Sequence, residues 1–170
     1  MDTRYTPIFL SCSLLLASLP GWSQTYFAAR SPEISAGQLD VLDLSTGISS
    51  QQIAVTISGQ PIDGLTGMAH NYSTDLTYVL VKQDTSIRLA QIDLWTGVLS
   101  NAVTLPDKFA SITFSTAGVL FGITGDGATV PESLYQIDPG TGNTTFVVSP
   151  GAGDDGEAIA FNTNEGLLYR

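Results

Sequence analysis

One nine-residue phrase recurs three times along the chain, and it constrains the fold more than any other feature. The copies share the skeleton Leu-x-x-(Leu/Ile)-Asp-x-x-Thr-Gly and span residues 39–47, 89–97 and 134–142. Their aspartates are 50 and then 45 positions apart, at Asp43, Asp93 and Asp138. A fixed phrase at this period is typical of a stacked or radial array of similar units.

A second phrase also recurs three times, once after each copy of the first phrase. It consists of a strand-like run of small residues, a polar turn and a run with an aromatic residue, at residues 67–80, 110–123 and 157–169. Such short β-branched and aromatic runs between Gly, Asp, Asn and Ser predict strands, and no segment shows a helical period. Each unit then has four strands, the outer ones expected at residues 52–57, 102–105 and 145–148. The prediction is an all-β chain of four-stranded antiparallel blades, the unit of a β-propeller.

The end of the first phrase has the chemistry of a tight hairpin turn. An Asp carboxylate accepts hydrogen bonds from amides two residues further on, and Gly takes the positive φ that closes the hairpin. This predicts a structural role for Asp43, Asp93 and Asp138. A repeated ring of acidic ligands is the alternative.

The phase of the repeat predicts how the units are divided. Residues 25–63 are expected to form an incomplete blade, residues 64–106 and 107–149 complete blades, and residues 150–170 the start of another. About three blades form an open arc, because closed propellers need at least four. We expect a piece of a longer protein. A short arc that closes by self-association is the alternative.

The first 24 residues are predicted to be a signal peptide. A short polar start with Arg4 precedes an apolar run over residues 7–19, and Pro20-Gly21 ends it. The run is short for a membrane span, although a signal anchor is the alternative. Cys12, the single cysteine, lies inside this run rather than at its end, which disfavours a lipid anchor. The expected location is secreted, periplasmic or at the cell surface, with no membrane span after the signal.

Charge narrows the classes of partner. The chain has 16 acidic and 6 basic residues, a net charge of −10. This surface repels phosphate backbones and anionic lipids, so we expect no nucleic-acid partner. A protein, a glycan or a small molecule is the expected ligand.

The two phrases together resemble the repeats of secreted bacterial β-propellers, including quinoprotein-like, YVTN and NHL repeats of the WD40/YVTN-like group. The resemblance covers about residues 25–170. Quinoprotein repeats place a Trp four residues after the Gly, where this chain has Gln51, Asn101 and Phe146. This departure disfavours a quinone cofactor. The resemblance implies a fold but no activity, because propellers have many functions.

Three other kinds of feature are candidates for chemistry. His70 is the only histidine, and because Phe114 and Phe161 occupy its equivalent positions it is expected to be packed in the core. Two acidic, glycine-rich segments, residues 125–127 and 151–157, offer oxygen ligands without the spacing of a known calcium loop. Asn71 and Asn143 begin N-glycosylation patterns, which are otherwise turn sequences.

These observations favour a binding or surface-interaction module over an enzyme. No catalytic set, metal site or cofactor site is assigned, and no cofactor is expected. A metal-dependent hydrolase of the lactonase type, with His70 near the central opening, is the alternative. A quinoprotein oxidoreductase is a more distant third.

Overall fold

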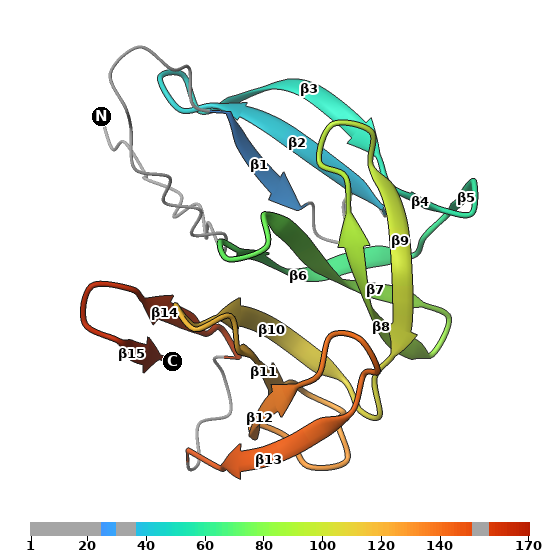
Figure 1. Cartoon of the computed structure of the whole chain (residues 1–170). Helices are drawn as coiled ribbons and strands as arrows, with labels where there is room; N and C mark the ends of the chain where they lie inside the picture. The colour runs from blue at the N-terminus through green and yellow to red at the C-terminus, as the bar shows by residue number, and fades with distance from the viewer. Residues whose placement is uncertain (1–24, 30–36, 151–156) are drawn as a thin grey trace, which may run out of the picture.

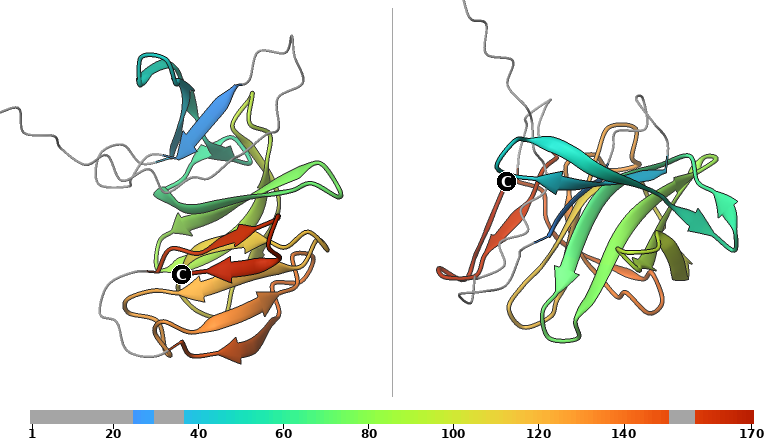
Figure 2. Two further views of the ribbon diagram at one scale, coloured as in Figure 1. Left: turned by 90° about the vertical axis from the view of Figure 1, so that its left-hand side faces the viewer. Right: turned by 90° about the horizontal axis from the view of Figure 1, so that it is seen from above.

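The computed structural model describes residues 25–29, 37–150 and 157–170. Within these ranges the chain forms fifteen β-strands and no helix, so no described helix could cross a membrane. Four sheets follow one another in chain order, from the blue N-terminal strands to the red C-terminal strands (Figure 1). Figure 2 shows the same succession from two further sides. The prediction of an all-β partial propeller is confirmed.

Each sheet is built from strands that are neighbours in sequence. The first sheet contains β1 (Tyr26–Ala29), β2 (Gln38–Asp43) and β3 (Ile48–Ala54). The second contains the antiparallel strands β6 (Gly64–Asn71), β7 (Leu76–Gln83), β8 (Ser86–Ile92) and β9 (Val98–Thr104). The third contains β10 (Phe109–Phe114), β11 (Leu120–Thr124), β12 (Leu134–Ile137) and β13 (Thr144–Val148). The fourth contains β14 (Ala160–Asn162) and β15 (Leu167–Tyr169).

The expectation of one continuous outer strand over residues 52–57 is wrong. Strand β3 ends at Ala54, and the next two residues form β4 (Thr56–Ile57), which pairs in parallel with β9 of the second sheet. A two-residue strand β5 (Gln60–Pro61) pairs with β4, so the second sheet has six strands. The cause is Val55, whose buried side chain and amide bond to the Gly37 carbonyl turn the chain towards the next sheet.

The register shows which residues are equivalent in the first three sheets. In each, the Leu that opens the repeated phrase lies opposite an apolar residue of the outer strand. The three pairs are Leu39 with Ile53, Leu89 with Val103, and Leu134 with Val148. These pairs define a common frame for comparing one sheet with the next.

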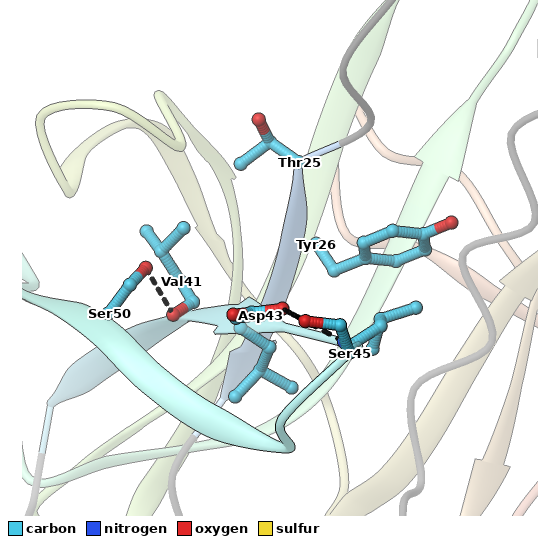
Figure 3. Close-up of a pocket in the computed structure, with 8 residues that line it drawn as sticks. Thr25, Tyr26, Val41, Asp43, Ser45 and Ser50 are labelled. Carbon is cyan, nitrogen blue, oxygen red and sulfur yellow. Dashed lines mark hydrogen bonds between the residues drawn. The ribbon is translucent and has the colours of Figure 1, made fainter.

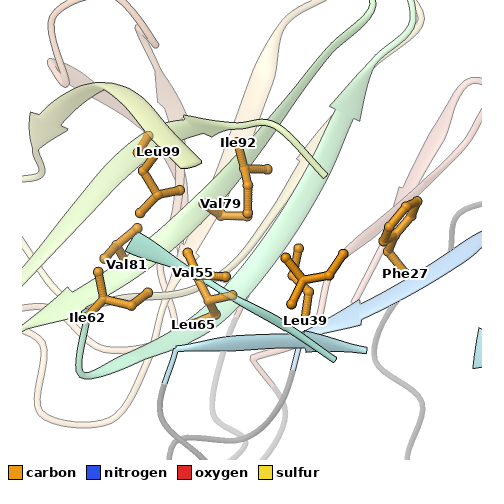
Figure 4. Packing of buried hydrophobic residues seen from close by; sticks show 11 residues of the cluster. Phe27, Leu39, Val55, Ile62, Leu65, Val79, Val81, Ile92 and Leu99 are labelled. Carbon is orange, nitrogen blue, oxygen red and sulfur yellow. The ribbon is translucent and has the colours of Figure 1, made fainter. Parts of the chain in front are cut away.

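Apolar side chains fill the spaces between successive sheets. Figure 4 shows the first of these layers, where Phe27 and Leu39 of the first sheet meet Val79, Val81 and Ile92 of the second. A second layer joins the second and third sheets around Leu80, Leu89, Phe109 and Leu120. The third layer has only Ile123, Leu134 and Ile159 as buried members among the described residues. Because each buried aliphatic or aromatic side chain contributes about 1.5–3 kcal/mol, the two-stranded fourth sheet is held less firmly than the others.

Candidate functional site

Antiparallel connectivity gives each sheet two ends with different roles. Within the second and third sheets, the turn after the first strand and the Asp-x-x-Thr-Gly turn lie at one end, which we call the corner end. The turn after the second strand and the connection to the next sheet lie at the other, the loop end. We call each Asp-x-x-Thr-Gly turn a corner.

The three corner aspartates hold their own turns. Asp43 accepts hydrogen bonds from the Ser45 amide (2.8 Å) and hydroxyl (2.7 Å). Asp93 accepts from the amides of Trp95 (2.9 Å) and Thr96 (3.0 Å). Asp138 accepts from the Gly140 amide (2.9 Å) and the Thr141 hydroxyl (2.8 Å).

These hydrogen bonds also set the acidity of the corners. The Ser45 hydroxyl lowers the pKa of Asp43, the Thr96 amide lowers the pKa of Asp93, and the Thr141 hydroxyl lowers the pKa of Asp138. The glycines that end the three corners, Gly47, Gly97 and Gly142, have φ values of 70°, 70° and 78°. Each carboxylate is directed into its own hairpin, so the three aspartates form separate turns and not a shared ligand set.

Two corners also pack against the sheet before them. A Cβ added to Gly97 would lie 2.2 Å from the Ala54 carbonyl oxygen, and one added to Gly142 would lie 2.6 Å from the Thr104 carbonyl oxygen. The Gly97 carbonyl accepts a hydrogen bond from the Thr56 amide at 3.0 Å. Glycine is therefore required at both positions for two reasons: it adopts the positive φ, and it allows the close approach of a second backbone.

His70 lies at the corner end, on β6. Its Nδ1 is 3.0 Å from the Thr77 hydroxyl, its Nε2 is 3.5 Å from a carboxylate oxygen of Asp75, and its ring meets the Tyr72 ring edge-on at 4.7 Å. The His70 side chain is 15% exposed and the Asp75 side chain 98%. The contacts are those of a hairpin turn, and they bring a single carboxylate to the ring.

The loop end of the third sheet is the most elaborate described surface. Residues 125–133 connect β11 to β12, and both Thr124, which precedes this loop, and Ser133, its last residue, are fully buried. The Thr124 hydroxyl donates to the Val130 carbonyl (2.7 Å) and accepts from the Ser133 amide (2.9 Å). This closes the base of the loop, which we call the 125–133 loop.

Asp107 anchors the 125–133 loop from outside. Both of its carboxylate oxygens accept a hydrogen bond from the Thr129 amide, at 2.8 and 3.0 Å. Burial raises the pKa of Asp107, but the amides of Thr129, Lys108 and Val130 outweigh it and keep the pKa below its ordinary value. Sequence reasoning missed Asp107, because its partner is 22 residues away and no local pattern links them.

The two acidic, glycine-rich segments meet at this end. The Asp126 amide donates to a carboxylate oxygen of Glu157 at 3.1 Å. A Cβ added to Gly127 would lie 3.2 Å from Nζ of Lys108, so the lysine lies over the loop. Arg170 forms an ion pair with Glu132 at 2.8 Å. Residues 151–156 of the second segment lie outside the described residues.

Neither end gathers a metal-binding set from the part of the chain that the structure describes. No group of three or more His, Cys, Asp or Glu side chains there could hold a metal ion. Asp126 contributes its amide rather than its carboxylate to the contact with Glu157. His70 lies at the corner end beside Asp75, opposite to the contact between Asp126 and Glu157.

An open hollow of about 400 Å³ lies on the first sheet beside its corner (Figure 3). Ser50 donates to the Val41 carbonyl at its edge, at 3.1 Å. The lining residues are Thr25, Tyr26, Val41, Leu42, Asp43, Leu44, Ser45 and Ser50. A similar hollow of about 440 Å³ lies where the third sheet's corner meets the end of β9.

The two glycosylation patterns have different environments. Asn71 is buried, and its side-chain oxygen accepts the Ser73 amide at 3.0 Å, which is the geometry of a turn residue. Asn143 is exposed, next to the third corner. Only Asn143 is thus accessible to a modifying enzyme.

Comparison with known proteins gives matches of shape alone. No family model and no curated protein matches the chain. Similar solved structures include Kuenenia stuttgartiensis hydrazine synthase (14% identity, TM-score 0.42) and the Dos1 propeller (14% identity, TM-score 0.47). A protein of unknown function from Bacteroides caccae has 9% identity and a TM-score of 0.45.

The chain is short beside these proteins. The matches cover 64%, 78% and 86% of this chain in the order given above. They cover 28%, 33% and 64% of the respective structures, so the chain spans less than two thirds of the length of each.

Proposed function

We propose that this chain is an exported β-propeller module that binds a protein, glycan or small molecule at its loop end. The observation that carries the proposal is the fixed 125–133 loop, held by Asp107 and lying against Glu157. Loops placed on a rigid scaffold are the usual site of recognition. The exposed Asp126 and the nearby Lys108 give this surface charges of both signs.

The test is a binding screen with the full chain against glycan and peptide arrays. We expect binding that Asp126→Ala and Lys108→Ala reduce at least tenfold. Asp75→Ala is the matched control, because that side chain is 98% exposed at the corner end. Binding that the control weakens as much as the loop-end variants would place the site elsewhere.

Export and the hydrolase alternative are tested separately. We propose that residues 1–24 direct export and are removed, leaving residues 25–170 as the propeller domain. Mass spectrometry of the exported protein is expected to show their loss, and a retained N-terminus would contradict export by cleavage. Hydrolysis of a lactone panel that stops on addition of a chelator would instead support the lactonase alternative.

A further inference from the structure

The junction between the first and second sheets and the junction between the second and third sheets are built on the same plan. At the first junction the Val55 amide donates to the Gly37 carbonyl at 2.7 Å, and at the second the Leu105 amide donates to the Ile87 carbonyl at 3.0 Å. Both donor residues are buried. Val55 and Leu105 are therefore equivalent, and the residues that follow them can be compared one by one. Both junctions lie inside the described range 37–150.

A short strand fills the first junction. Strand β4 pairs in parallel with the start of β9, and the Thr56 amide donates to the Gly97 carbonyl at 3.0 Å. Strand β5 pairs with the far side of β4, so two strands lie beyond β9 (Figure 1). The chain itself thus covers the outer edge of the second sheet at this junction.

The second junction has no such strand. Pro106 occupies the position of Thr56, and proline has no amide hydrogen to donate. The connection is also shorter, with residues 105–108 between β9 and β10 against residues 55–63 between β3 and β6. No described amide donates to the Gly142 carbonyl, which is equivalent to the Gly97 carbonyl. β13 is therefore the outermost described strand of the third sheet.

An open hollow lies where the strand would be. Its volume is about 440 Å³, and it is lined by residues 104–106 and 141–144, none of which is charged. The Asn143 carbonyl accepts from the Asp138 amide at 2.8 Å, inside the sheet. The alternation of an antiparallel ladder then directs the Thr144 amide outwards. The hollow offers the Gly142 carbonyl as acceptor and the Thr144 amide as donor, which are the groups of an open strand edge.

We propose that this hollow binds an extended peptide segment of a partner protein, which pairs in parallel with the start of β13 as β4 pairs with β9. Addition of a strand to an open sheet edge is a known mode of peptide recognition, in which main-chain hydrogen bonds give the affinity. β4 is the template for the ligand. Its Thr56 supplies the amide, and its Ile57 packs on the apolar layer beneath. The site is separate from the loop-end surface and does not depend on the function proposed for it.

Charge restricts the class of peptide. The chain has a net charge of −10, although the lining of the hollow contributes none of it. The Asp138 carboxylate lies at the edge of the hollow, where it accepts from the Thr141 hydroxyl at 2.8 Å. A segment with an uncharged, β-branched centre and basic flanks fits this surface, because the negative field of the chain attracts the flanks.

The test uses the full chain and a synthetic peptide that carries the sequence of residues 54–61, which includes β4, between lysine pairs. Titration calorimetry is expected to show saturable binding of one peptide per chain, with an affinity that falls as salt rises. Hydrogen exchange followed by mass spectrometry should slow at residues 141–146 on binding and stay unchanged in the 125–133 loop. A scrambled peptide between the same lysines should bind at least tenfold more weakly.

The decisive variant is Thr144→Pro, which removes the outward amide. Proline is tolerated in an edge strand when its missing donor faces solvent, so the sheet should remain intact. We expect at least a tenfold loss of peptide affinity. Thr144→Val is the matched control, because it keeps both the amide and the branched side chain, and it should leave the affinity unchanged. Circular dichroism checks that both variants are folded.

The exchange measurement uses the unaltered chain, so it tests the proposal even if Thr144→Pro does not fold. Absence of saturable binding, or slowed exchange elsewhere than at residues 141–146, would overturn the proposal. Equal binding of the scrambled peptide would show charge attraction alone and would also overturn it. So would equal affinities of folded Thr144→Pro and Thr144→Val.

Discussion

The corner at Gly97 and the corner at Gly47 have the same sequence skeleton and different surroundings. Both aspartates accept an amide two residues on, and both glycines have φ of 70°. Only the Gly97 corner lies against another sheet, with the Ala54 carbonyl oxygen 2.2 Å from where a Cβ would be. A repeated phrase therefore determines the local turn, whereas its place in the array determines how much the fold depends on it.

The largest effect should come from Gly97→Ala. The new Cβ would meet both the Ala54 carbonyl oxygen and the Ile53 side chain, in addition to the strain of positive φ. We expect a loss of about 3 kcal/mol in the free energy of unfolding, combining overpacking with backbone strain. Urea unfolding followed by circular dichroism measures this loss. A value near that of Gly47→Ala would contradict the difference in packing between the two corners.

Gly142→Ala should come second. Its Cβ would lie 2.6 Å from the Thr104 carbonyl oxygen, a less severe overlap than the 2.2 Å from the Ala54 carbonyl oxygen at Gly97. The expected loss is about 2 kcal/mol, from the same two causes. The same urea experiment applies, with the ranking of the two glycines as the result to check. A loss in the free energy of unfolding larger than that of Gly97→Ala would contradict the expected ranking.

Gly47→Ala should have a smaller effect. The position has open space, so only the conformational preference for glycine is lost. We expect about 1 kcal/mol, the cost of placing a residue with a Cβ at positive φ. In urea unfolding at low protein concentration, a loss as large as that of Gly97→Ala would show that this corner is already packed.

The smallest effect concerns pH. The folded pKa values of Asp43, Asp93 and Asp138 are lowered, so these carboxylates stabilise the fold above their unfolded pKa. That contribution should be lost as the pH falls through their folded pKa values. Asp93→Asn keeps an acceptor oxygen and removes the titration. Its urea midpoint should fall less between pH 6 and pH 3 than the wild-type midpoint, and parallel curves would contradict this.

Local chemistry could be predicted from the sequence, because it depends on neighbours along the chain. The Asp-to-amide bonds and the positive φ of the corner glycines follow from five consecutive residues, and the structure confirms them. The succession of antiparallel strands follows in the same way from short apolar runs between turns. These features account for the correct fold class.

The remaining features depend on partners far away in sequence. The expected strand over residues 52–57 divides at Val55, where the Val55 amide bonds to the Gly37 carbonyl and the Thr56 amide bonds to the carbonyl of Gly97, 41 positions after Thr56. Asp107 reaches the 125–133 loop for the same kind of reason. The acidic, glycine-rich segments are visible as sequence patterns, but the contact of Asp126 with Glu157 follows only from the packing of the third and fourth sheets.

Strand β4 has a further consequence for behaviour in concentrated solution. By pairing with β9 it covers the outer edge of the second sheet, where an uncovered strand could template aggregation. β3, the outer strand of the first sheet, is protected instead by its polar Ser and Gln residues. β13 has neither defence in the described structure, and its exposed Phe146, Val147 and Val148 make it the segment from which thermal aggregation should begin.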